Sequence, residues 1–225
     1  MEQIVSSGII NSYFKKLNDA LSIDVAVVGG GPSGLVASTI IAKKGFNVAL
    51  FERKLAPGGG MWGGAMMFNE IIVQHEAIHI LNNFNINYKE YKNNYYVVDS
   101  IEATSALIYN AAKTGVKIFN CISVEDLVIH NNKVTGLVIN WTPVHRESLH
   151  IDPLIIIAKY TIDSTGHDCE LAKTLERKNN VKLNTPTGKV MGERSLSIDE
   201  AEKTTIDNTK EIFNGLYVCG MAANG

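Results

Sequence analysis

Residues 24–34 read DVAVVGGGPSG, and this stretch decides the fold of the chain. Its apolar half, residues 25–28, leads directly into glycines, which is typical of a strand buried on both faces of a parallel sheet. Residues 33–44 are compatible with a helix, and residues 47–51 form a second apolar run. A strand, a glycine turn, a helix and another strand make a βαβ unit.

The glycines match a nucleotide-binding fingerprint, Gly29-x-Gly31-x-x-Gly34, and Glu52 ends the next strand 18 residues later. Glycines let the backbone approach a pyrophosphate, the helix N-terminus offers free N–H groups, and the acid binds ribose hydroxyls. An acidic residue here favours an adenosine with a free 2′-hydroxyl, as in NAD or FAD, over NADP. Arg53 and the glycines at 58–60 extend the pattern to that of flavoproteins, which favours FAD. A purely structural glycine turn is the alternative interpretation.

The whole chain, residues 1–225, is predicted to form one dinucleotide-binding domain of the α/β class. We expect a Rossmann-like FAD/NAD-binding fold, in which a βαβ unit over residues 23–52 starts a parallel central sheet and an antiparallel portion is inserted over about residues 85–160. Residues 1–21 have the spacing of an amphipathic helix packed on the body or on a neighbouring subunit. The other expected elements are helices at 71–84, 101–114 and 170–178, strands at 95–98, 116–119 and 155–162, a hairpin over 125–141 turning at Asn131-Asn132, and a closing strand and glycine turn at 215–225.

Composition and charge limit the classes of function. The 225 residues carry a formal net charge of −2, which argues against nucleic acid as the main partner. The apolar runs are shorter than the roughly 18 to 20 residues of a membrane span. Three irregularly spaced cysteines fit a reducing compartment, so we expect a cytoplasmic protein.

Two sets of residues are candidates for metal binding. His75-Glu76-x-x-His79 matches the zinc protease pattern, but a βαβ nucleotide fold is the wrong context, so we favour ordinary residues there. The second set is His150, Asp152 and His167. These residues lie in two loops that bracket one strand, so a common site needs a curled loop or a second subunit. A carboxylate with an imidazole suits Fe(II), Mn(II) or Zn(II). A turn cap and a surface loop residue are the alternatives.

Several longer segments together resemble the thiamine thiazole synthase family over essentially the whole chain. The resemblance rests on residues 24–34, on ERK at 52–54, GGGMWGG at 58–64, VQ at 73–74, HIDP at 150–153, STGHD at 164–168 and GLYVCGMAAN at 215–224. These proteins bind NAD where relatives bind FAD, and they consume it as a substrate. The resemblance implies that nicotinamide is expelled and that the remaining ADP-ribose condenses with glycine and sulfur to an adenylated thiazole carboxylate.

The residue before Ile151 divides this family. In the fungal and plant enzymes it is a cysteine that gives up its own sulfur, whereas here it is His150, as in the archaeal branch that uses free sulfide and Fe(II). The resemblance makes Asp152, from the adjacent subunit, and His167 the iron ligands, and it offers His150 as a proton shuttle or as an inert replacement. It also implies homo-octamers with shared sites. To the fingerprint residues Gly29, Gly31 and Gly34 it adds the following NAD contacts: Ser33, Glu52, Arg53, Gly60, Val124, His150, Ile151, Asp152 and Met221.

Other interpretations remain open from the sequence. Family members continue beyond the Met-Ala-Ala-Asn turn to an arginine that holds the glycine carboxylate. We therefore expect either a truncated C-terminus after Gly225 or another way of holding glycine. The runner-up functions are an FAD-dependent oxidoreductase on the same fold and a non-catalytic NAD-binding fragment. Cys169 is a candidate sulfur donor outside the family's donor position, and we do not favour it.

Overall fold

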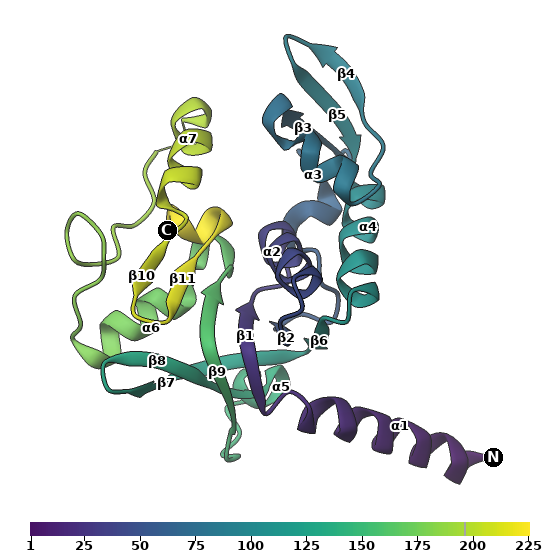
Figure 1. Ribbon diagram of the computed structural model, residues 1–225, viewed down its shortest axis with the longest axis vertical. Helices are drawn as coiled ribbons and strands as arrows, with labels where there is room; N and C mark the ends of the chain where they lie inside the picture. Colours follow the sequence, from purple (N-terminus) through teal and green to yellow (C-terminus); the bar gives the residue numbers. More distant parts are fainter. Residues whose placement is uncertain (196) are drawn as a thin grey trace.

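The computed structural model describes residues 1–195 and 197–225 (Figure 1). Its helices are α1 (Glu2–Asn18), α2 (Pro32–Lys43), α3 (Ile78–Asn83), α4 (Ser100–Lys113), α5 (Thr142–Arg146), α6 (Glu170–Asn179) and α7 (Ile198–Asn208). Its strands are β1 (Ser22–Val28), β2 (Val48–Glu52), β3 (Glu70–Gln74), β4 (Lys89–Lys92), β5 (Tyr95–Asp99), β6 (Lys117–Asn120), β7 (Ile122–His130), β8 (Lys133–Trp141), β9 (Leu154–Asp163), β10 (Glu211–Phe213) and β11 (Leu216–Val218).

The central sheet is mostly parallel and has the order β10-β11-β9-β1-β2-β6. Strand β1 lies between β9 and β2 and pairs with both in parallel. The carboxyl ends of β1, β2 and β9 therefore meet at one edge of the sheet. This architecture, with helices on both faces, confirms the predicted α/β class and the βαβ start.

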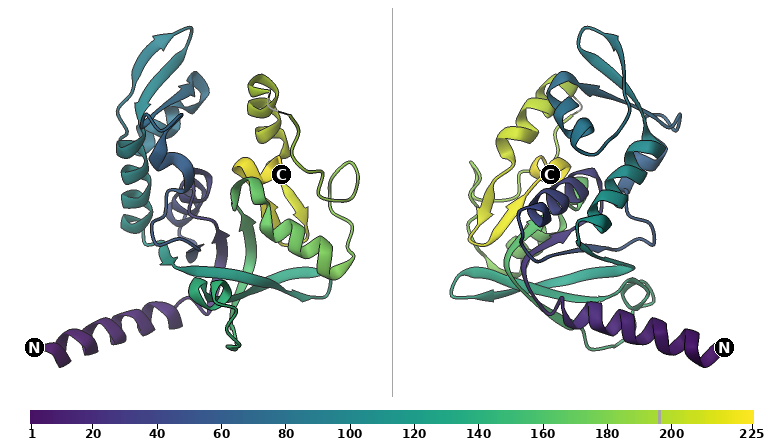
Figure 2. Two further views of the ribbon diagram at one scale, coloured as in Figure 1. Left: turned by 180° about the vertical axis from the view of Figure 1, so that it is seen from behind. Right: turned by 45° about the vertical axis from the view of Figure 1, so that its right-hand side comes forward.

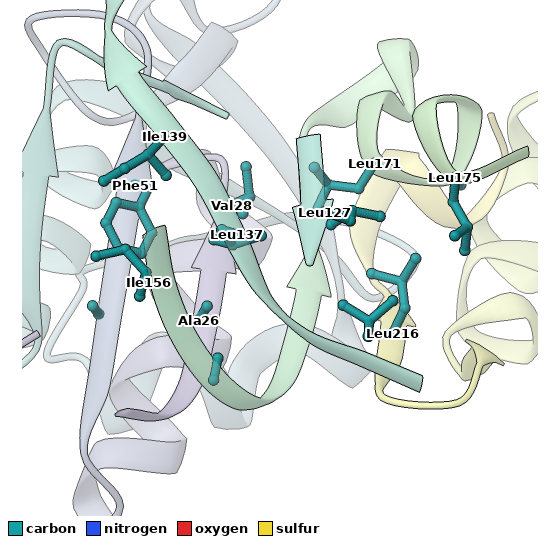
Figure 3. Packing of buried hydrophobic residues seen from close by; sticks show 14 of the residues in the cluster. Ala26, Val28, Phe51, Leu127, Leu137, Ile139, Ile156, Leu171, Leu175 and Leu216 are labelled. Atoms are coloured by element: carbon teal, nitrogen blue, oxygen red, sulfur yellow. The ribbon is translucent and has the colours of Figure 1, made fainter. Parts of the chain in front are cut away.

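The alternation of side chains along β1 and β2 supplies two hydrophobic cores, one on each face of the sheet. Val25 and Val27 face α2 and α4, in a cluster with Leu35 and Leu107. The intervening residues of the two strands face the second core. Figure 3 shows that core, in which strand residues meet side chains of β8, α6 and β11: Ala26, Val28, Phe51, Leu127, Leu137, Ile139, Ile156, Leu171, Leu175 and Leu216.

Besides the short pair β10–β11 at the edge of the central sheet, antiparallel pairing occurs in two further places. The hairpin β7–β8 turns at Asn131 and Asn132, whose φ angles of 50° and 58° suit a tight hairpin turn, and β8 continues into an antiparallel pair with β9. This confirms the predicted hairpin. The second place is a separate three-stranded sheet of order β3-β5-β4, which projects beyond α4 (Figure 1).

The prediction of a helix over residues 71–84 is wrong for the first half of this segment. Residues 70–74 form β3, which pairs with β5, and only residues 78–83 form α3 after a short 3₁₀ turn. The run Ile71-Ile72-Val73 is β-branched, and its preference for a strand prevails once β5 is available as a partner. The sequence analysis assigned no element to β4, α7 or β10.

Helix α1 confirms the expected N-terminal helix, but most of it extends away from the body in every view (Figures 1 and 2). Leu17 is its only residue in the buried class, and Phe14 is 57% exposed. Two arrangements were expected for this helix: packing on the body of the same chain, or packing on a neighbouring subunit. The first is wrong for most of the helix. Among the residues that the structure describes, no helix is both long and apolar enough to cross a membrane.

Candidate functional site

A wide cleft of about 2320 Å³ opens at the carboxyl ends of β1, β2 and β9. It is larger than the pocket of one small ligand, about 300–1,000 Å³, and therefore leaves room for an extended molecule. The fingerprint loop, the end of β2 and the loop after β9 all contribute to its wall. The expected site residues that line it are Gly29, Gly31, Ser33, Glu52, Arg53, Gly60, Val124, His167 and Met221.

The fingerprint glycines have distinct roles in the turn from β1 to α2. Gly29 has a φ of +101°, and a Cβ there would lie 2.3 Å from the carbonyl oxygen of Ser164. A Cβ on Gly34 would lie 2.1 Å from the Gly29 oxygen, so Gly34 permits close packing of helix on strand and does not line the cleft. Gly31 is open, with nothing within 4 Å of an added Cβ. Because Pro32 starts α2 beside Gly31, the free N–H groups of the helix face the cleft.

Glu52 is buried at the end of β2, and backbone donors occupy both of its carboxylate oxygens. The Gly30 N–H donates to Oε2 and the Lys54 N–H donates to Oε1, each at 2.7 Å. The carboxylate thereby joins the fingerprint loop to the segment after β2. Each oxygen retains lone pairs with which it can accept a further bond.

Arg53 extends from the end of β2 to the segment after β9. Its guanidinium forms ion pairs with Asp168, at 2.9 Å, and with Glu170. Its own carbonyl oxygen accepts a bond of 2.8 Å from the Thr142 hydroxyl, which fixes the backbone at this point. The pKa of Arg53 is raised, because these acids and Glu52 outweigh the opposing effect of burial.

Asp163 ends β9 and organises the loop that follows. It is fully buried, and its Oδ1 accepts bonds from the backbone and the hydroxyl of Thr165, at 3.0 and 2.7 Å. Its Oδ2 accepts bonds from the N–H groups of Leu171 and Ala172 at the start of α6. Burial raises the pKa of Asp163, while these hydrogen bonds oppose the rise. The loop carrying His167 is thus attached at both ends to one carboxylate.

His167 lies on the cleft wall, and its Nδ1 contacts the carboxylate of Glu193. An imidazole engaged in this way through Nδ1 offers Nε2 as a metal-binding atom. Imidazole and carboxylate donors together suit Fe(II), so His167 fits one half of such a site. Among the side chains that the structure describes, no three of His, Cys, Asp or Glu gather as a metal-binding group.

His150, Ile151 and Asp152 lie at the other end of β9, outside this cleft, and all three are exposed. The ten residues of β9 separate them from His167 by about 30 Å, at about 3.3 Å per residue. The Asn140 side chain donates to the Ile151 carbonyl at 3.2 Å and fixes the loop backbone. One chain therefore does not bring Asp152 and His167 together.

Two thiols near the cleft, the buried Cys169 and the partly buried Cys219, have raised pKa values. Burial raises the pKa of Cys169 to about 12, and it raises that of Cys219 to about 11 while a hydrogen bond with Ser33 opposes the rise. The Cys169 thiol donates to the Ala222 carbonyl at 3.2 Å. Neither thiol is activated as a nucleophile, because the reactive form is the thiolate.

The two histidines of the HExxH pattern do not share one helix. His75 lies in the 3₁₀ turn and is 3.3 Å from the Tyr96 hydroxyl. His79 lies in α3, and its Nδ1 bonds to the Glu76 carbonyl. Both histidines therefore have local structural contacts.

The sequence analysis assigned no role to Asp163, Asp168, Glu170 or Glu193. An acid at the end of a buried parallel strand, before a short helix, is a detectable signal for Asp163. The contacts of the other three join segments up to 117 residues apart, and no local pattern indicates them.

The topology of the sheet and the cleft at its carboxyl edge define a Rossmann-like α/β protein. The structure of the myxobacterial FAD-dependent halogenase CndH resembles this chain with a TM-score of 0.52. The match covers 68% of this chain and 39% of the halogenase chain. At 18% identity, this similarity demonstrates the fold alone.

The chain belongs to the Thi4 family of thiamine thiazole synthases, whose family model matches residues 6–225. The thiamine thiazole synthase of Solidesulfovibrio magneticus is 51% identical over 99% of this chain and 86% of the relative. The crystal structure of Thermovibrio ammonificans THI4 has a TM-score of 0.95 and 50% identity, and it covers all of this chain and 86% of that one. These similarities confirm the family that the sequence motifs indicate.

Proposed function

We propose that this protein is a sulfide- and Fe(II)-dependent thiamine thiazole synthase. It converts NAD, glycine and sulfide to an ADP-linked thiazole carboxylate and releases nicotinamide. One observation carries the proposal: in a chain of the Thi4 family, most of the expected NAD contacts and His167 line a single cleft.

The cleft can hold NAD through the chain's own groups. The N-terminus of α2 and the open position at Gly31 suit the pyrophosphate, because free N–H groups and the helix dipole favour an anion there. Glu52 can accept bonds from the ribose hydroxyls with its remaining lone pairs. Holding the dinucleotide in one orientation brings its reacting carbon to the residues that act on it.

The proposed iron ligands are Asp152 and His167. When bound, Fe(II) supplies Lewis acidity and a template for sulfide. The chain's own contribution is to hold the His167 ring through Glu193 and to position it through the Asp163 network. His150 lies two residues before Asp152, so its imidazole can exchange protons at the same site.

A second copy of the chain is needed to complete this site. The His150 loop is exposed and adjoins exposed apolar side chains: Leu149, Ile151, Ile155 and Ile157. Apolar residues of α1, among them Ile9 and Phe14, are exposed as well. Exposed apolar surface of this extent marks protein interfaces, and a homo-octamer that covers it would bring Asp152 of one protomer to His167 of its neighbour.

The decisive experiment is an anaerobic assay of the purified protein with NAD, glycine, sulfide and Fe(II). Mass spectrometry should detect an adenylated thiazole carboxylate and one equivalent of released nicotinamide, and omission of any one component should prevent product formation. Absence of product from the complete mixture contradicts the proposal. Tightly bound FAD with flavin absorbance would identify an oxidoreductase instead.

The pair Gly31→Ala and Gly8→Ala tests the nucleotide site separately. Both glycines have open space for a methyl group, but only Gly31 lies on the cleft, whereas Gly8 lies in the exposed α1. We expect G31A to fold and to bind NAD at least about tenfold more weakly, whereas G8A binds as the parent does. Equal NAD affinity in both variants would place the pyrophosphate elsewhere.

A further inference from the structure

The ion pairs of Arg53 cross the fingerprint turn. Arg53 follows β2, while Asp168 and Glu170 follow β9, and the sheet order places β1 between these two strands. The guanidinium and its two carboxylates therefore lie across the carboxyl end of β1. That end carries the turn where the proposed pyrophosphate lies.

The backbone that carries the two carboxylates is fixed by the loop itself. Asp168 ends a 3₁₀ turn and Glu170 begins α6, and between them Cys169 has a φ of 46°, a left-handed conformation. The Glu170 N–H donates to the Thr165 hydroxyl at 2.8 Å. Arg53 has the longest of the three side chains, and it is 47% exposed on a backbone fixed by Thr142, so its guanidinium can turn towards the cleft.

The charges around this cation are not balanced. Asp168, Glu170 and Glu52 all act on the single guanidinium of Arg53. A diphosphate entering here adds negative charge beside three carboxylates that already act on this one guanidinium. An arginine binds phosphate oxygens with the same paired N–H groups with which it binds a carboxylate, so phosphate and carboxylates require the same donors.

We propose that Asp168 and Glu170 compete with the pyrophosphate of the bound dinucleotide for Arg53, and so limit the affinity of the cleft for ADP-containing ligands. In the empty cleft the guanidinium pairs with the two carboxylates, and in the occupied cleft it turns to the phosphates. The competition weakens retention of every ligand that carries the ADP group, the ADP-linked product included. This inference rests on the proposed nucleotide site, because it assigns the determinants of affinity in that site.

The test compares ADP with adenosine, which lacks the phosphates, by calorimetric titration of the full chain. In D168N/E170Q, which keeps the size of both side chains, we expect ADP to bind about threefold to tenfold more tightly and adenosine to bind unchanged. In an R53Q background the same two substitutions should improve ADP binding less, because the contested cation is gone. The single variant E170Q gives the same comparison if the double variant does not fold.

The control variant D24N/E2Q removes two carboxylates away from the cleft. Asp24 pairs with Lys159 near the start of β1, and Glu2 lies in the exposed α1, so ADP affinity should stay at the parent value. Weaker or unchanged ADP binding in D168N/E170Q overturns the inference, as does an equal shift for adenosine. A parent protein that binds neither ADP nor adenosine refutes the proposed nucleotide site as well, which separates the two failures.

Discussion

The two loops at the ends of β9 differ in how many contacts they make within their own chain. The loop after Asp163 is attached to a buried carboxylate by four hydrogen bonds and lies on the cleft wall. The loop before Leu154 is exposed, and one bond from Asn140 fixes its backbone at Ile151. One half of the proposed iron site is therefore preformed within the chain, while the other half presents its residues outward.

This difference has a physical cause in the sheet. The carboxyl end of β9 meets β1 and β11, with α6 packed close by, so its loop is surrounded by partners from the same chain. The amino end of β9 pairs only with β8 and β1, and Ile155 and Ile157 remain 55% and 44% exposed. In the assembly proposed above, a second protomer covers this end of the strand.

The largest effect should come from substituting the proposed iron ligand in one loop or the other. Either D152A or H167A alone should lower thiazole formation at least about a thousandfold, because each removes one proposed iron ligand. Mixed and reassembled, the two inactive variants should recover about a quarter of the parent activity, since one in four shared sites then has both residues intact. The assay is product formation under anaerobic conditions. No recovery on mixing means that the two loops do not share a site.

The preformed loop should also keep its cysteine unreactive. With a pKa of about 12, Cys169 at pH 8 holds roughly a thousandfold less thiolate than a thiol of ordinary pKa 9, so its alkylation should be slower by about that factor. Because the pKa is raised, the rate should increase about tenfold for each pH unit through neutral and mildly alkaline pH. Mass spectrometry of native protein treated with iodoacetamide measures this, with unfolded protein as the control. Rapid alkylation of Cys169 at pH 8 would contradict this prediction, and Cys169 would again be a candidate sulfur donor.

The Asp163 network should dominate the stability of this end of β9. Asp163→Asn places an amide NH₂ group against N–H donors that now face a carboxylate oxygen, so we expect a loss of about 2–4 kcal/mol in the free energy of unfolding. Urea unfolding followed by circular dichroism measures the change. Asp152→Asn, the same substitution in the outward loop, is the matched control and should leave the free energy within about 0.5 kcal/mol of the parent. Similar losses in both variants would remove the contrast between the loops.

The smallest effect is expected at His150. Its exposed side chain has room on all sides in one chain, so His150→Ala should change the free energy of unfolding of the isolated protomer by less than about 0.5 kcal/mol. If His150 moves protons, the same variant should lower the rate of product formation and alter its pH profile while NAD affinity stays constant. An unaltered pH profile identifies His150 as an inert replacement for cysteine.

Local patterns were sufficient for much of the fold. The apolar run at residues 25–28, the fingerprint glycines and Glu52 predicted the βαβ unit, because glycine turns and buried strands have strong local signatures. Asn131 and Asn132 predicted the hairpin turn for the same reason. Residues 70–74 were assigned wrongly, because a short β-branched run takes its conformation from its partner, and β5 begins more than twenty residues later in the chain.

The features of the proposed site also fall into two groups: those set by local sequence and those set by tertiary structure. The sequence by itself determined the family, the nucleotide fingerprint and the residue types at both ends of β9, because these depend on neighbours in the chain. Only the tertiary structure decided that Arg53 meets Asp168 and Glu170, that Asp163 supports the His167 loop, and that Asp152 lies a strand's length from His167. Those relations depend on which strands lie side by side, and strand order is set by packing of the whole sheet.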